Sequence, residues 1–210
     1  MASYDLEAYR RGHLGPGGTD LRGRRIVVFD LETRRAIGAG SDRAEIAELG
    51  MSVGVTFSYR DGLYRTYGEN EAEDLVAELI AASGVIGYNV IGFDYPVLAG
   101  EVPGFDARAL RTLDLMVELQ KAVGFRPRLN HLLAATFHAA KSGNGLEAIA
   151  LYRDMQWDKL VSYCLDDVAL TRALFEYGRE TGTVALEVEG AVRTVSVDWK
   201  AFPGDKGLFD

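Results

Sequence analysis

The chain has a single cysteine, Cys164, among its 210 residues. One cysteine excludes an intramolecular disulfide and any zinc site built from several cysteines. It also suits a reducing compartment, so we expect a cytoplasmic protein. Long apolar runs are absent as well, because the most apolar region, residues 75–93, is interrupted by Glu78, Gly84 and Asn89. We therefore expect neither a membrane span nor a secretory leader.

Basic residues are outnumbered: 23 Lys and Arg face 31 Asp and Glu, for a formal net charge of −8. This balance disfavours broad nucleic-acid binding, because phosphate contacts need Lys and Arg. The objection is weak for a nuclease, since bound cations offset the charge of an acidic metal site. Arginine is locally dense at 22–25, 34–35, 108–111 and 126–128. For each cluster two interpretations stay open, a phosphate contact or a solvated surface.

Four carboxylates and one tyrosine fall in three short motifs. In chain order these are Asp30-Leu31-Glu32, Asn89-Val90-Ile91-Gly92-Phe93-Asp94 and Tyr163-Cys164-Leu165-Asp166-Asp167. No single motif is specific, but the ordered set suits nuclease chemistry with two metal ions. Two cations roughly 3.5–4 Å apart can clamp the attacking and leaving oxygens of a phosphoryl displacement.

The first motif ends a predicted buried strand over residues 25–31. Side chains two apart on a strand point to the same face, so Asp30 and Glu32 project together. Adjacent carboxylates repel unless a cation joins them, and oxygen ligands suit Mg²⁺ or Mn²⁺. The alternative is a strand-end turn in which one acid caps the next element.

The second motif follows a short predicted strand over residues 84–88. We expect Asp94 in the first turn of a helix, where the helix dipole favours a carboxylate. Asn89 would cap or bridge the preceding loop. The alternative is that Asp94 is a first-turn acid and no more.

The third motif lies on a predicted helix, where Tyr163 and Asp167 share one face because they are four residues apart. A phenol titrates near pH 10, so Tyr163 suits orienting a water better than acting as a general base. The alternative for Tyr163 is a packing aromatic. We interpret Asp166 as a solvated acid and Cys164 as a small core residue.

The three motifs resemble those of the DEDD superfamily of 3′–5′ exonucleases, which includes proofreading domains and ribonuclease-D-like enzymes. The family pattern is Asp-x-Glu, Asn-x-x-x-Phe-Asp and Tyr-x-x-x-Asp, matched here by Asp30 and Glu32, by Asn89, Phe93 and Asp94, and by Tyr163 and Asp167. The histidine branch has a histidine where this chain has Ser162, so the chain resembles the tyrosine (DEDDy) branch. Over residues 25–180 the wider strings look most similar to bacterial stand-alone ribonuclease-H-like exonucleases.

The resemblance implies that Asp30, Glu32, Asp94 and Asp167 hold two divalent cations, Mg²⁺ or Mn²⁺, some of them through water. With Tyr163 these would be the catalytic residues. Thr33, Asn89, Phe93 and Lys141 are the candidate substrate-binding residues, although Lys141 fits a solvated loop lysine equally well. Many relatives have a small residue soon after the first motif, whereas this chain has Arg34-Arg35 and, we expect, a loop over residues 34–45.

The element pattern predicts an α/β ribonuclease-H-like fold. A three-stranded antiparallel meander and further parallel strands form a mixed sheet flanked by helices. We expect a loosely packed N-terminal extension over 1–24, an exonuclease domain over 25–180, and a C-terminal hairpin and tail over 181–210. Asp158 is the predicted N-cap of the longest helix, which ends near Arg179.

The predicted function is hydrolysis of terminal phosphodiesters at the 3′ end of single-stranded nucleic acid, with DNA slightly favoured over RNA. The single-strand preference follows because a stacked duplex end cannot reach a metal pair in a cleft. Two alternatives stay open: a catalytically silent nucleic-acid-binding module, and a ribonuclease-H-type endonuclease. Asp205 to Phe209 faintly resembles a sliding-clamp-binding peptide but lacks the usual leading glutamine.

Overall fold

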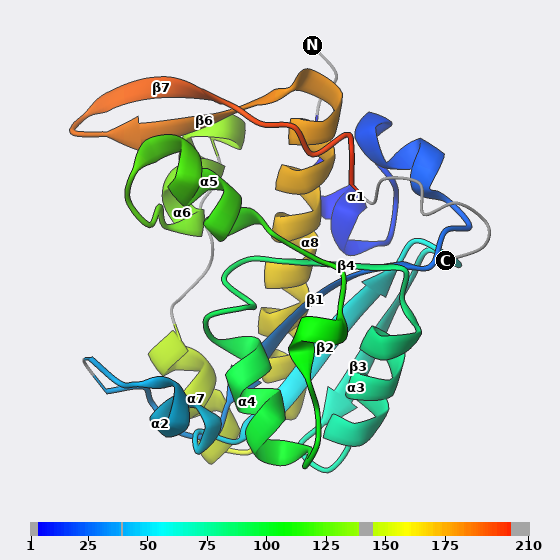
Figure 1. The fold of residues 1–210 in the computed structure, drawn as a ribbon, viewed down its shortest axis with the longest axis vertical. Helices are drawn as coiled ribbons and strands as arrows, with labels where there is room; N and C mark the ends of the chain where they lie inside the picture. Colours follow the sequence, from blue (N-terminus) through cyan, green and yellow to red (C-terminus); the bar gives the residue numbers. More distant parts are fainter. Residues whose placement is uncertain (1–3, 39, 139–144, 203–210) are drawn as a thin grey trace.

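The computed structural model describes residues 4–38, 40–138 and 145–202 (Figure 1). Its main sheet has five strands in the order β3-β2-β1-β4-β5. The strands are β1 (Ile26–Thr33), β2 (Met51–Ser58), β3 (Leu63–Gly68), β4 (Gly84–Gly87) and β5 (Thr112–Asp114). β1, β2 and β3 pair antiparallel, whereas β4 pairs parallel with β1 and with β5. The predicted mixed sheet of a meander plus parallel strands is confirmed.

Helices cover both faces of this sheet, and a two-stranded hairpin packs beside them (Figure 1). The helices are α1 (Leu6–Arg10), α2 (Arg43–Ala47), α3 (Ala72–Ala81), α4 (Asp94–Glu101), α5 (Leu115–Val123), α6 (Leu129–Phe137), α7 (Gly145–Arg153) and α8 (Trp157–Thr181). The hairpin strands are β6 (Thr183–Val188) and β7 (Ala191–Ser196), which confirms the predicted C-terminal hairpin. No helix in the described parts of the chain is both long and apolar enough to cross a bilayer.

Strand β1 separates two apolar clusters. Ile26 and Val28 pack in the cluster that includes α8, whereas Val27 and Phe29 pack in the cluster that includes α3 and α4. Because side chains alternate along a strand, Asp30 shares the face of Ile26 and Val28. The sheet therefore directs its strand-end carboxylates toward α8.

Helix α8 begins two residues earlier than predicted. Gln156 is its N-cap residue and makes no side-chain capping bond, whereas Asp158 lies in the first turn. A carboxylate there still interacts favourably with the helix dipole, which explains why the sequence signal misplaced the boundary. The helix ends at Gly182, whose left-handed backbone (φ 71°) stops it.

The N-terminal segment packs tightly on α8, so the expectation of loose packing is wrong. Tyr9 and Leu21 are buried. The Glu176 carboxylate of α8 accepts hydrogen bonds from the Tyr9 hydroxyl (2.8 Å), the Gly15 N–H (2.7 Å) and the Tyr59 hydroxyl (2.8 Å). Burial raises the pKa of Glu176. This carboxylate of α8 therefore joins the N-terminal segment to the turn that follows β2.

Glycine makes that close packing possible. A Cβ atom on Gly17 would lie 1.9 Å from the carbonyl oxygen of Glu176, which no real side chain tolerates. The fully buried guanidinium of Arg172 lies over the Phe57 ring at 3.7 Å and donates to the Tyr9 carbonyl oxygen (2.8 Å). Residues 15–18, Gly-Pro-Gly-Gly, thus allow close contact between the N-terminal segment and α8.

Candidate metal centre

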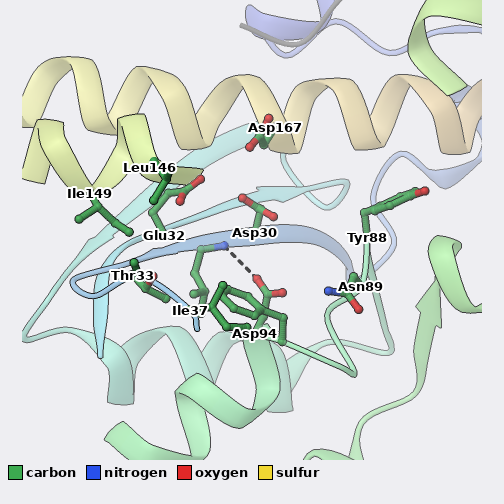
Figure 2. A pocket seen from close by; sticks show the side chains of 13 residues that line it. Asp30, Glu32, Thr33, Ile37, Tyr88, Asn89, Asp94, Leu146, Ile149 and Asp167 are labelled. Atoms are coloured by element: carbon green, nitrogen blue, oxygen red, sulfur yellow. Dashed lines mark hydrogen bonds between the residues drawn. The ribbon is translucent and has the colours of Figure 1, made fainter. Parts of the chain in front are cut away.

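Three of the four predicted carboxylates converge at the end of β1. Asp30 and Glu32 come from the strand and Asp167 from α8, and one oxygen of each lies within 4.8 Å of the others. Figure 2 shows the three side chains pointing toward one another across the space between β1 and α8. Acids 137 and 135 positions apart in sequence are brought together by packing a helix on the strand face that carries them.

A small residue allows α8 to lie this close to β1. Cys164 is fully buried, and its sulfur lies 3.4 Å from the backbone oxygen of Asp30 and 3.8 Å from its carboxylate. Burial raises the pKa of the Cys164 thiol well above its usual value, and the negative charges of Asp30 and Glu32 raise it further. Cys164 is the small core residue that the sequence predicts, and its thiol is poorly suited to act as a nucleophile.

Asp94 lies in the same cavity but is held apart from the group of three. It begins α4, is 2% exposed, and accepts a hydrogen bond from the Leu31 N–H at 3.1 Å. The pairing of β4 with β1 ends at Val28, so Asp94 bonds to a part of the β1 edge that β4 does not reach. Burial raises the pKa of Asp94 to about 7, and the nearby charges of Asp114 and Asp167 add to the rise.

A carboxylate missed by the sequence reasoning fixes the loop before Asp94. Asp114 is 2% exposed and caps α5 by accepting from the Met116 and Val117 N–H groups at 3.1 and 3.3 Å. It also accepts from the Asn89 N–H at 2.8 Å and the Ile91 N–H at 3.0 Å. Asn89 itself has a left-handed backbone, with φ of 66°. Asp114 thus pins the β4–α4 loop to the start of α5.

The predicted substrate-binding residues fall into two groups. Thr33, Asn89 and Phe93 line the cavity beside the carboxylates, whereas Lys141 lies outside the described residues. The Asn89 side-chain oxygen accepts a hydrogen bond from the Arg126 guanidinium. Asn89 therefore both shapes the loop and holds an arginine at the cavity.

Two cavities meet at the carboxylates. The larger, with a volume of about 520 Å³, has an apolar wall made by Leu31, Ala36, Ile37, Phe93, Leu146 and Ile149. The smaller, of about 380 Å³, is lined on its far side by Met116, Arg126, Pro127, Arg128 and Leu129. Both are bounded by Asp30, Tyr88, Asn89 and Asp167. The acidic cluster thus lies between an apolar space and a basic one.

Tyr163 lies one helical turn before Asp167, as expected, but it is not among the residues lining either cavity. Its side chain is 6% exposed and packs in the apolar cluster that includes α8. This placement matches the packing alternative, and the predicted role in orienting water stays a prediction.

Several charged residues near the motifs have structural partners. Asp166 forms an ion pair with Arg10 of α1 at 2.6 Å, so the prediction of a solvated acid is wrong. Arg34 pairs with Glu101 at 2.5 Å. Arg35 donates to the Glu48 carbonyl oxygen. Arg34 and Arg35, which follow the first motif, therefore make contacts within the fold.

The segment after these arginines is not a plain loop, because α2 forms within it. Asp42 caps this short helix in a reciprocal arrangement with Glu45. The helix packs on α4, where a Cβ atom on Gly100 would lie 1.9 Å from the Ala47 carbonyl oxygen. Ala36 and Ile37, which precede this helix, line the larger cavity.

Comparison with known proteins supports the fold and no closer relationship. No protein-family model matches the sequence, and no curated protein matches it either. Among solved structures, the family B DNA polymerase from the hyperthermophilic archaeon Pyrobaculum calidifontis matches with a TM-score of 0.53 and 18% identity. The match covers 73% of this chain but only 24% of the polymerase chain. With the mixed sheet and its flanking helices, this likeness confirms the predicted ribonuclease-H-like fold.

Proposed function

We propose that this protein is a metal-dependent 3′–5′ exonuclease that acts on single-stranded nucleic acid by a two-metal-ion mechanism. The observation that carries the proposal is the convergence of Asp30, Glu32 and Asp167 within 4.8 Å, with Asp94 in the same cavity. A ribonuclease-H-like fold that resembles part of a DNA polymerase supports it. Similarity of fold alone does not establish an activity.

The donor set fits hard divalent cations. All four side chains offer carboxylate oxygens, which are the ligands that Mg²⁺ and Mn²⁺ prefer. Their negative charge reaches the neighbouring thiol, because all four carboxylates help to raise the pKa of Cys164. When bound, two such cations supply activation of the attacking water and stabilisation of the departing 3′ oxygen.

Each residue of the proposed centre is assigned a separate role. We assign Asp30, Glu32 and Asp167 to direct cation binding, because their oxygens already lie together. Asp94 is assigned to the same centre through water, since its carboxylate is held by the Leu31 N–H. Tyr163 is proposed to orient the attacking water, and Tyr163→Phe tests this role because it removes only the hydroxyl.

The apolar cavity supports a product of one nucleotide at a time. Its volume of about 520 Å³ lies within the range of small-molecule pockets, and its apolar wall suits a nucleobase. We therefore propose release of nucleoside 5′-monophosphates from a 3′ end, with Phe93 and Thr33 against the terminal nucleoside. We propose DNA as a slightly better substrate than RNA.

We also propose a role in DNA repair and a cytoplasmic location, which a single buried cysteine suits. Residues 205–209, which resemble a sliding-clamp-binding peptide, lie outside the described residues, and we propose only a weak contact with a clamp.

The direct test is digestion of 5′-labelled single-stranded DNA and RNA with Mg²⁺, with Mn²⁺ or with chelator. A ladder of shortened, still labelled products that appears only with cation is the expected result. Asp167→Asn should lower kcat by about 10³-fold or more, because a metal ligand supplies several kcal/mol to the transition state. Asp166→Asn is the matched control, since this adjacent acid pairs with Arg10 and should leave kcat within about two-fold.

Two further experiments separate the alternative functions. A circular single strand has no end, so its cleavage would identify an endonuclease and contradict the proposal. Calorimetric titration with Mn²⁺ separates a catalytic centre from a silent module, because a module without cation binding shows no heat. Undiminished digestion by Asp167→Asn would also refute the proposed centre.

A further inference from the structure

The smaller cavity has a feature that the metal centre does not explain. Arg126 and Arg128, between α5 and the start of α6, line it together with Asp30 and Asp167. Both arginines are exposed, and neither forms an ion pair with an acidic side chain in the described parts of the chain. Two guanidinium groups thus lie beside the acidic cluster, and no acidic side chain of the described residues forms an ion pair with either of them.

The lack of an ion pair distinguishes Arg126 and Arg128 from Arg34 and Arg179, among the described residues. Arg34 and Arg179 each form a short ion pair with an acidic side chain. Arg126 instead donates to the neutral amide oxygen of Asn89. An amide partner orients a guanidinium without neutralising it, so the charge stays available to an anion.

The loop that carries the two arginines is held in place. The Tyr88 hydroxyl donates to the Pro127 carbonyl oxygen at 2.8 Å, and Pro127 is buried between the two arginines. Tyr88 and Asn89 are consecutive residues after β4, and the Asn89 N–H is itself bonded to Asp114. The backbone between the two arginines is therefore held by the loop that leads to Asp94, and the Arg126 side chain is also held there by Asn89.

Chemistry differs on the two sides of the carboxylates. Leu146 and Ile149 lie on one side, and Tyr88 and Asn89 on the other (Figure 2). A phosphodiester held at the acidic cluster must place one nucleoside on each side. The apolar side suits the terminal base, and the arginine side suits the backbone of the strand that remains.

We propose that Arg126 and Arg128 bind the backbone phosphate of the nucleotide next to the scissile bond, on the strand that remains after cleavage. The inference rests on the proposed function and extends it. It makes the preferred substrate an oligonucleotide with at least one phosphate beyond the one attacked. The arginines select for that phosphate, and the bases on that side are not read.

Two substrates test this assignment. Single-stranded oligothymidylate carries the additional phosphates, whereas the p-nitrophenyl ester of thymidine 5′-monophosphate has the terminal nucleoside and the attacked phosphate only. For Arg128→Ala and for the Arg126→Ala/Arg128→Ala pair, KM on oligothymidylate should rise about 10-fold or more, by the loss of charge-assisted hydrogen bonds. Hydrolysis of the ester should stay within about two-fold, which also shows that the variants are folded. Arg108→Ala is the matched control, because its 91% exposed side chain pairs with Asp106 and lines neither cavity.

Salt dependence gives an independent measurement. Fluorescence anisotropy titrations with labelled oligothymidylate in Ca²⁺ give the binding constant at several salt concentrations. The slope of its logarithm against the logarithm of the salt concentration, the salt slope, should fall in magnitude by about 0.7 for each arginine removed. Equal losses on both substrates would overturn the assignment, since the arginines would then serve the attacked phosphate or the fold. Unchanged KM and unchanged slope would overturn it as well. If the wild-type protein hydrolyses neither substrate, the proposed function fails, and the salt slope still decides whether the arginines bind the strand.

Discussion

Asp114 is the buried acid on which the geometry of the centre depends, so removing it has a calculable cost. Three N–H groups, those of Asn89, Met116 and Val117, donate to its Oδ1 atom, and the Ile91 N–H donates to Oδ2. Asp114→Ala leaves all four donors without this acceptor. A lost helix cap costs about 1 kcal/mol. Each of the two loop bonds to a charged group is worth about 1.5–3 kcal/mol. We therefore expect the free energy of unfolding to fall by at least about 4 kcal/mol.

Asp114→Asn is the discriminating partner of that substitution. An amide oxygen in the Oδ1 position still accepts from Asn89, Met116 and Val117, and only the Ile91 N–H then faces an NH₂ group. The expected loss is therefore about half as large, roughly 2 kcal/mol. Urea denaturation followed by circular dichroism measures both values. Equal losses in the two variants, or losses under about 0.5 kcal/mol in both, would refute the reasoning.

Two further predictions concern the acid beside the centre and the helix that carries it. The pKa of Asp94 is raised from its ordinary value to about 7, so its contribution to stability is present at low pH and is lost as the pH rises through about 7. In chelator, wild-type stability should fall between about pH 4 and pH 7 more than that of Asp94→Asn, and a parallel fall in both would contradict this. Gly100→Ala should destabilise by about 1–3 kcal/mol, although alanine ordinarily favours a helix, because its Cβ would meet the Ala47 carbonyl oxygen. Urea denaturation checks this, and a more stable variant would show that α2 moves aside freely.

The alternation of side chains made the sheet and part of the centre predictable. Asp30 and Glu32 follow a run of apolar residues at a spacing of two, so their common face could be stated before their surroundings were known. The turn of a helix likewise placed Tyr163 and Asp167 on one side. These inferences needed only local geometry, which the sequence contains.

What could not be predicted depends on contacts between distant segments. Asp114 is a lone acid between two leucines, and nothing near it in sequence shows that Asn89 and Ile91 will donate to it. Gly17 resembles a linker glycine until Glu176 is placed against it. By contrast, Asp42 and Glu45 have the spacing of a capping box, so α2 was visible in the sequence and was missed.

Helix α8 carries both Asp167 and Glu176, so the candidate metal centre and the contacts that hold the N-terminal segment lie on one helix. Trimming the chain so that it begins at residue 25 would remove Tyr9 and Gly15, which donate to Glu176. It would also open the Arg172 guanidinium to water on the side now sealed by Tyr9. The first two dozen residues are thus as much a part of the folded domain as the strand that bears its acids.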